Sequence, residues 1–288
     1  MKNVLIVTNF NAGRKQAIKY KKKVLNFVLE YAAYFKFVDI DEFKNTDLYD
    51  FDTIIAMGGD GTVNKVLPYV CRTQKSLGII PCGTANLLAA KLGIPSNIDK
   101  ALNIIKINNI KPIDVLNIND KLCILRCGLG YDADIICKTP QSLKNKFGYL
   151  AYFIAGIIFA LRLKKKKYEL TIDNNPRTVE ASCIIFSNAS NMYKNFVSVG
   201  KDTKLDDNLA DIFILKTTNP IIFFIEFLKI LLNIKNNGKY SEFLKAKDIS
   251  VLNNWQVCHI DGEKTTLKDN ISLKVINSGI RVFSAKPQ

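Results

Sequence analysis

The chain has 288 residues, of which 48% are hydrophobic and 23% charged, and this composition excludes a mostly disordered protein. Lysine and arginine number 41 against 26 acidic residues, a formal net charge of +15 at pH 7, so anionic partners are favoured: nucleic acid, phosphorylated small molecules or an acidic membrane surface. The only histidine is His259, and no cysteine pair has zinc-ligand spacing with a second pair, which argues against a His/Cys metal centre and a Ser-His-Asp hydrolase.

The N-terminus and the cysteines indicate the compartment. The opening residues MKNVLIVTNFNAG are typical of a strand and not of a signal peptide, because the apolar run is short. The seven cysteines are odd in number and most lie in apolar stretches, which predicts buried thiols in a reducing environment. We therefore expect a cytoplasmic protein.

Residues 1–110 alternate between short apolar strands and helical stretches. The runs VLIVTN, KFVDID, FDTIIAMGG and SLGIIPCG are expected strands, separated by a Lys-rich helix that ends near Tyr34 and by the helix VNKVLPYV. Strand and helix in turn predict a parallel α/β sheet. We place this first, parallel α/β domain at residues 1–115.

Short β-rich runs follow, from PIDVLNI through YELTID and ADIFILK to ISLKVI. Many short strands in succession predict an antiparallel, sandwich-like second domain at residues 116–277, interrupted by helical insertions near 142–163 and 220–234. A C-terminal strand at about 278–288 could return to the first domain. Exposed strand edges leave a homo-oligomer open.

Two apolar stretches raise the question of membrane contact. Residues 147–161 carry no charge, and as a helix they would span about 22 Å, less than the roughly 30 Å hydrocarbon core. The run is therefore a buried helix or an interfacial one, and Arg162 and Lys164–Lys167 beside it favour anionic lipid in the second case. The stretch 220–234 contains Glu226 and Lys229 and predicts an amphipathic helix that packs inward or touches a bilayer.

The strongest motif is Gly58-Gly59-Asp60-Gly61-Thr62, which follows the apolar strand TIIAM and precedes a helical pattern beginning near Asn64. Glycines at a strand-to-helix turn let backbone N–H groups approach a phosphate, and the helix N-terminus adds partial positive charge. The sequence matches neither a Walker A motif nor a dinucleotide fingerprint. It predicts a nucleotide-phosphate loop in which Asp60 orients Mg²⁺ or the transferring phosphate.

Two further loops have similar composition and position. Pro81–Asn86 (PCGTAN) again lies between an apolar strand and a helix, and Asn9–Gly13 follows the first strand. Loops at neighbouring strand ends face one another across a crevice in open α/β sheets, so together they predict a nucleotide cleft.

These residues carry a resemblance to a known family. GGDGTVN, PCGTAN and the late Asp261-Gly262-Glu263 resemble the diacylglycerol kinase catalytic-domain family, which includes bacterial lipid kinases and the sphingosine and ceramide kinases. GGDGT alone also occurs in NAD kinases, but the combination is more specific, and the resemblance covers essentially the whole chain. It implies an NAD-kinase-like first domain and ATP-dependent phosphorylation of a lipid hydroxyl, with Mg²⁺, at the inner face of the membrane. Nucleotide is expected between the domains, with lipid approaching from the second.

The resemblance also implies roles for individual residues. Glu263 is the expected general base, with Asp60 as the competing candidate. The segment 204–209 (KLDDNL) resembles the family's structural Mg²⁺ loop, which implies ligation by the Asp207 carboxylate and by the backbone oxygens of Lys204 and Leu209. The implied ATP-binding positions are Asn9, Phe10, Asn11, Ala12, Gly13, Gly58, Gly59, Asp60, Gly61, Thr62, Val63, Asn64 and Thr84.

Some positions depart from the family pattern. Phe10 and Ala12 stand where Pro and Ser are usual, and Leu87 stands where an Asp is common. Asn208 replaces the Gly of the metal loop, a substitution that Asn tolerates because it can adopt a left-handed conformation.

Two segments of the second domain carry further expectations. Gly128–Ala133 resembles the family's Gly-Phe-Asp-Ala turn, or is a plain hairpin element, and residues 191–201 are an expected substrate-side segment.

The alternative functions belong to different classes. The departures leave open a catalytically silent nucleotide- or lipid-binding protein, and the first loop leaves open an NAD kinase. Nucleic-acid binding is disfavoured because the basic residues are dispersed and no recognition motif is present.

Overall fold

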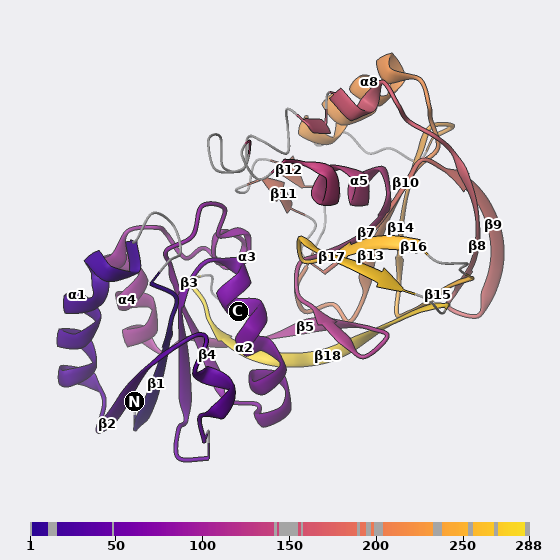
Figure 1. Cartoon of the computed structure of the whole chain (residues 1–288). Coiled ribbons are helices and arrows are strands. Elements are labelled where there is room, and N and C mark those ends of the chain that lie inside the picture. Colours follow the sequence, from indigo (N-terminus) through magenta and orange to yellow (C-terminus); the bar gives the residue numbers. More distant parts are fainter. Residues whose placement is uncertain are drawn as a thin grey trace. The chain divides into compact units, whose positions relative to one another are not determined.

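The computed structural model describes residues 2–10, 16–47, 49–140, 143, 155–156, 158–188, 191–193, 197–198, 204–232, 238–252, 256–267 and 270–285. The chain divides into two units (Figure 1). The first comprises Met1–Ile113 and Ser278–Gln288, and the second Asp114–Asn277.

The first unit contains a mainly parallel sheet with the strand order β2-β1-β3-β4-β18. Its central strands are buried on both faces, with Val4–Val7 fully inaccessible, as expected for apolar strands covered by helices on either side. The strands are β1 (Asn3–Thr8), β2 (Tyr34–Asp39), β3 (Thr53–Gly58), β4 (Ser76–Pro81) and the end of β18 (Ile271–Phe283), where Arg281 and Val282 pair with β4 in parallel.

Helices lie on both faces of this sheet (Figure 1). Right-handed crossovers that run from β1 to β2 and, in the other direction, from β3 to β4 place their helices on opposite faces. In the strand order, β2 lies on one side of β1, and β3 and β4 lie on the other. The position between β1 and β3 is therefore the topological switch point, where α/β sheets bind ligands. The elements are α1 (Gln16–Tyr31), the 3₁₀ turn η2 (Phe43–Asn45), α2 (Asp60–Thr73), α3 (Leu87–Lys91) and α4 (Ile98–Ile107).

The second unit is built from two antiparallel sheets whose apolar faces share one core. One sheet has the order β18-β15-β8-β9, with β5 and β6 joined to it through β18, and the other has the order β14-β13-β10-β7-β16-β17. Side chains from both sheets, such as Leu170, Ile249, Phe186 and Ile212, belong to the same buried cluster. The strands are β5 (Ile110–Ile118), β6 (Lys121–Cys123), β7 (Arg126–Gly130), β8 (Lys166–Ile172), β9 (Asn175–Ala181), β10 (Cys183–Ser187), β13 (Ala210–Leu215), β14 (Ser241–Ala246), β15 (Asp248–Leu252), β16 (Gln256–Ile260) and β17 (Glu263–Leu267).

An ion-pair cluster joins the two sheets at one edge. Arg177 on β9 donates two hydrogen bonds, of 3.0 and 2.9 Å, to the Glu242 carboxylate on β14, and Lys216 Nζ lies 2.6 Å from the same group. The α/β unit and the antiparallel unit together confirm the predicted fold class.

Two helices, α5 (Tyr131–Lys138) and α8 (Pro220–Leu231), lie against the second unit's six-stranded sheet. A short β11–β12 pair (Asn191–Tyr193 and Val197–Ser198) falls in the expected substrate-side segment, the rest of which lies outside the described residues. The same holds for the apolar run 147–161, apart from residues 155, 156 and 158–161. Within the described ranges, none of the helices is both long and apolar enough to cross a bilayer.

The structure corrects two local expectations and confirms a third. The helix expected to begin near Asn64 begins at Asp60, because Gly59 is its N-cap and the carbonyl of Gly59 accepts from Thr62 N and Val63 N. Gly128–Ala133 is the turn from β7 into α5 and not a hairpin element. All seven cysteines are free thiols, as predicted, although Cys71 and Cys137 are only half-buried.

Candidate active site

Three polar loops of the first unit leave the same edge of the sheet. The strands β1, β3 and β4 are parallel, so the loops that follow Thr8, Gly58 and Pro81 emerge side by side. Backbone hydrogen bonds connect them: Asn9 N donates to the carbonyl of Met57 at 3.2 Å, and Cys82 N donates to the carbonyl of Gly58 at 2.8 Å. The sequence prediction that these loops share one edge is therefore confirmed.

The two glycine loops touch through their backbones. A Cβ atom built on Gly83 would lie 2.5 Å from Gly59 Cα, and one on Gly59 would lie 3.1 Å from Gly83 Cα. On Gly58 a Cβ would lie 2.0 Å from Thr62 Oγ1. These three glycines are required by close packing, whereas a Cβ on Gly61 would meet no described atom within 4 Å.

The first turns of α2 hold two buried polar atoms without a partner. Thr62 Oγ1 and Asn64 Oδ1 find no hydrogen-bond partner among the described residues, although buried polar atoms are normally satisfied. Thr62 lies directly over Gly58, at the helix N-terminus where backbone N–H groups and the helix dipole favour a phosphate. Such atoms fit a site completed by a bound polar ligand.

Asp60 and Asn86 shape the loops. Asp60 Oδ1 accepts a hydrogen bond of 3.3 Å from Leu88 N, which ties the first glycine loop to the start of α3. Asn86, at φ +51°, closes the second loop by accepting from Gly83 N at 2.9 Å and donating to Gly83 O at 2.8 Å. Thr84, which lies between Gly83 and Asn86 in the second loop, is exposed.

The other implied ATP-binding positions differ in their burial and contacts. Val63 is 2% exposed and belongs to the core. Phe10 lies under Lys21, whose Nζ is 5.4 Å from the ring centroid. Asn11, Ala12 and Gly13 lie outside the described residues.

In the second unit, Asp261-Gly262 forms the two-residue turn between β16 and β17. Both residues have positive φ, +49° and +88°, as a type I′ hairpin requires, which explains the Asp-Gly pair. The Asp261 carboxylate accepts hydrogen bonds from three backbone N–H groups, of residues 124, 125 and 126, at 2.8–2.9 Å. Burial raises the pKa of Asp261, and these hydrogen bonds offset part of the effect. Asp261 is thus a structural anchor, and Glu263 beside it is exposed.

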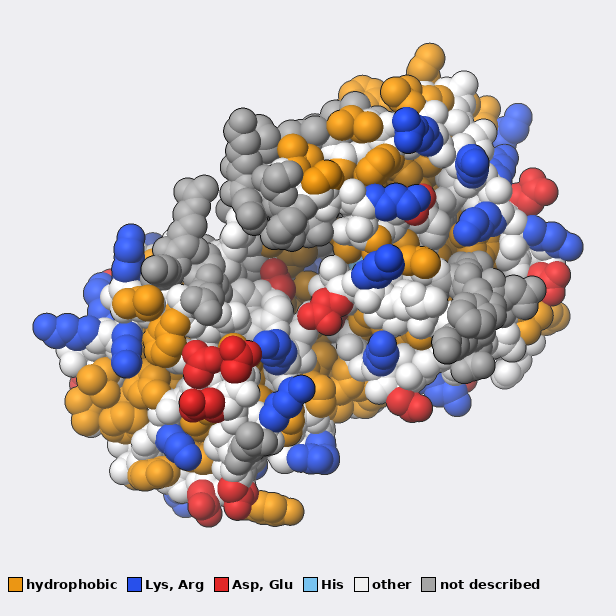
Figure 2. Space-filling view, viewed as in Figure 1, with side chains coloured by type: hydrophobic (Ala, Val, Ile, Leu, Met, Phe, Trp, Pro, Cys, Tyr) orange, Lys and Arg blue, Asp and Glu red, His pale blue; other side chains and the backbone are white. Residues whose placement is uncertain are grey.

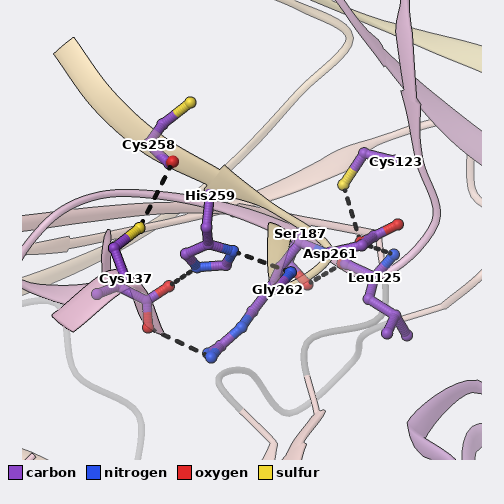
Figure 3. A network of polar contacts seen from close by, with 10 residues as sticks. Cys123, Leu125, Cys137, Ser187, Cys258, His259, Asp261 and Gly262 are labelled. Carbon is purple, nitrogen blue, oxygen red and sulfur yellow. Dashed lines mark hydrogen bonds and ion pairs between the residues drawn. The ribbon is translucent and has the colours of Figure 1, made fainter. Parts of the chain in front are cut away.

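A chain of polar contacts leads from this turn to α5 (Figure 3). Gly262 N donates to His259 Nδ1 at 3.3 Å, so the ring proton lies on Nε2 and is donated to Asp132 Oδ2 at 2.6 Å. Asp132 Oδ1 lies 3.3 Å from the Arg126 guanidinium. Burial alone would raise the pKa of Asp132, but the charge of Arg126 and the contact with His259 outweigh it and lower the pKa to about 2.

Gly128 makes this chain possible, because a Cβ there would lie 2.1 Å from Asp132 Oδ2 and 2.6 Å from His259 Nε2. The sequence reasoning did not find the roles of His259 and Asp132. The signal was the spacing of Gly128 and Asp132 in the Gly-Leu-Gly-Tyr-Asp run, which leaves room for the pair.

The implied metal loop is closed by protein groups. Asp207 Oδ1 accepts from Leu209 N at 3.2 Å, and Asp207 Oδ2 accepts from Lys245 Nζ at 2.6 Å. Partial burial lowers the pKa of Lys245, but the hydrogen bond that it donates to Asp207 and the charge of Asp211 outweigh this effect and raise the pKa. Asn208 has φ +57°, the left-handed conformation expected at this position.

This donor set does not fit a resident Mg²⁺, because the ammonium of Lys245 already balances the Asp207 carboxylate. Over the described ranges, no three histidine, cysteine or carboxylate side chains gather as a metal site.

Comparison with known proteins agrees with the loop geometry. The diacylglycerol kinase catalytic domain family matches residues 3–118. A diacylglycerol kinase of Bacillus subtilis (strain 168) is 30% identical over 224 residues, 76% of this chain and 74% of that protein.

Two further relatives align over less of their own length. An uncharacterised protein of Synechocystis sp. is 31% identical over 226 residues, 78% of this chain and 49% of that protein. A probable YegS-like lipid kinase of Citrobacter koseri is 38% identical over 128 residues, 43% of each chain. The alignments thus span about half the length of these two relatives.

A crystal structure of a diacylglycerol kinase from Bacillus anthracis str. Sterne has the same fold, with a TM-score of 0.77 at 21% identity over 98% of this chain and 96% of that one. The extent of the Bacillus subtilis match, together with the glycine loops, establishes that the chain belongs to the diacylglycerol kinase catalytic domain family.

Proposed function

We propose that the protein is an ATP-dependent lipid kinase that transfers the γ-phosphate of ATP to a hydroxyl group of diacylglycerol or a related lipid alcohol at the membrane surface. The observation that carries the proposal is the pair of glycine loops, in which Gly59 and Gly83 meet beside the N-terminus of α2. Family membership supports the same reaction class.

The first unit is suited to hold the phosphates. Its α2 N-terminus presents backbone N–H groups and a helix dipole, and phosphoryl transfer depends mainly on positioning and on stabilising negative charge. The unpartnered oxygens of Thr62 and Asn64 can bind the nucleotide or its hydration shell. Mg²⁺ enters this scheme with ATP, as part of the substrate.

Glu263 is the proposed general base, and Asp60 is the alternative. The base takes the proton of the lipid hydroxyl as its oxygen bonds to the γ-phosphorus and the bond to ADP breaks. Glu263 is exposed and follows a turn that Asp261 and His259 hold in place. Asp60 already accepts a hydrogen bond from Leu88 N, which favours a structural role for it.

The test measures phosphate transfer from ATP to vesicles that contain diacylglycerol, phosphatidylglycerol or a sphingoid base. Glu263→Gln is expected to lower kcat by about 10²-fold or more while ATP binding is unchanged. Glu180→Gln, at an exposed acid on β9, is the matched control and should behave as wild type.

Full turnover in Glu263→Gln with loss in Asp60→Asn would transfer the base role to Asp60. Tight ATP binding without any lipid product would instead support a silent nucleotide-binding protein, in line with Phe10 and Leu87. Phosphorylation of NAD in place of lipid would support an NAD kinase.

A further inference from the structure

Helix α8 exposes a continuous apolar face to solvent. Ile221, Phe224, Ile225 and Leu228 are 72%, 51%, 46% and 39% exposed, and their spacing places them on one side of the helix. We call these four residues the α8 outer face. Isolated apolar residues are common on protein surfaces, but a full helical stripe of them indicates an interaction site.

The opposite side of α8 fixes this orientation. Phe223 and Ile230 pack in a buried cluster with Phe213 of β13, and the buried carboxylate of Glu226 accepts from Ser241 Oγ of β14. The helix start is also specified, because the Asn219 side chain accepts from two backbone N–H groups and Pro220 occupies the first turn. The outer face therefore cannot turn inward without breaking the core contacts.

Cations lie beside a second apolar segment next to α8. Ala160 belongs to the same buried cluster as Ile230, while Leu161 is 75% exposed. Arg162 and Lys164–Lys167 follow directly and are all exposed. Figure 2 shows apolar and basic side chains intermixed on this part of the surface.

We propose that the α8 outer face, with Leu161, is a docking surface for an anionic lipid bilayer. Exposed apolar residues flanked by lysines are the pattern of an interfacial helix, in which the apolar face enters the acyl boundary and the cations meet acidic headgroups. A 12-residue helix is about 18 Å long, so it lies in the bilayer plane and does not span it. A second copy of the chain fits less well, because the same cluster of cations would face itself across a symmetric interface.

The inference rests on the proposed function only for its purpose, which is to bring the protein to its lipid. The test therefore needs no turnover: the full chain is sedimented without ATP with vesicles of phosphatidylglycerol and phosphatidylcholine, or of phosphatidylcholine alone. Wild type is expected to bind the anionic vesicles, and more weakly in high salt.

Ile221→Ser/Phe224→Ser/Ile225→Ser is expected to reduce partitioning onto the anionic vesicles by about tenfold or more. The control Ile18→Ser/Leu29→Ser/Ile107→Ser removes apolar residues of similar exposure from the first unit and should bind as wild type. Lys164→Gln/Lys165→Gln should weaken binding, whereas Lys19→Gln/Lys22→Gln on α1 should not. Thermal unfolding checks that every variant folds.

Wild-type-like binding by the α8 variant would overturn the proposal. It would also be overturned if wild type formed a dimer in solution that this variant dissociates while vesicle binding persists. Failure of the kinase assay would not affect these results, because vesicle binding is measured in the absence of ATP.

Discussion

Close backbone contact between Gly59 and Gly83 gives the first unit its most specific residue-level requirement. Gly83→Ala places a methyl group against Gly59 Cα, so we expect a loss of about 1–3 kcal/mol in the free energy of unfolding. Gly61→Ala, one helical position into α2, meets open space and should be neutral or stabilise by up to about 1 kcal/mol. Denaturant unfolding without nucleotide measures both, and equal effects would contradict the packing account.

Asp132 predicts an acid-dependent part of the stability. Its pKa is lowered from 3.8 to about 2, so its ionised form stabilises the fold at pH values above about 4, and this contribution of about 2 kcal/mol is lost as pH falls towards 2. The groups that face it are Arg126, His259 and the neutral Cys127, Cys183 and Tyr131.

Asp132→Asn should therefore unfold more easily at pH 5 and show a smaller further loss between pH 4 and 2 than wild type does. Asp134→Asn, at a half-exposed acid on the same helix, is the control. An unchanged acid profile in Asp132→Asn would show that the buried chain does not stabilise the ionised carboxylate.

At the same scale, the sequence predicted the loop residues better than the buried ones. Gly58 and Gly83 lie in short motifs at strand ends, so their position follows from local pattern. The role of Asp261 as an anchor of residues 124–126 depends on a contact across more than a hundred positions of the chain, which no local pattern records.

At the scale of elements, Lys245 of β14 pairs with Asp207, the expected metal ligand in the loop before β13. Because Lys245 neutralises Asp207, chelation of divalent cations should leave the melting temperature of the nucleotide-free protein unchanged. Lys245→Met should lower the stability by about 1 kcal/mol or less, since the pair is partly exposed. The exposed Lys247→Met is the control. A lower melting temperature of wild type in chelator would instead indicate a resident cation.

Strands were easier to predict than their partners. The apolar runs of β1 and β3 predict a parallel sheet because both faces of each strand are apolar. In the second unit, β7 pairs with β10 and with β16, which lie far along the chain, and only the folded core selects these pairs. An amphipathic helix was expected at 220–234 because Glu226 and Lys229 lie inside the apolar stretch, but which side faces solvent depends on the contacts of Phe223, Glu226 and Ile230.

At the scale of the whole molecule, the two units carry different parts of the proposed reaction. The first carries the glycine loops, the proposed phosphate site, at the switch point of its sheet, and the second carries Glu263 and the α8 outer face. The excess of cations over the chain suits both an anionic nucleotide and an acidic membrane surface.

The central claim is that this chain moves the terminal phosphate of ATP onto lipid. The most direct measurement is to incubate the protein with γ-labelled ATP, Mg²⁺ and diacylglycerol vesicles, and to count the label in the organic extract. The account predicts labelled lipid with wild type and with Glu180→Gln, and label near background with Glu263→Gln. Wild-type protein that binds ATP but leaves every tested lipid unlabelled would contradict it.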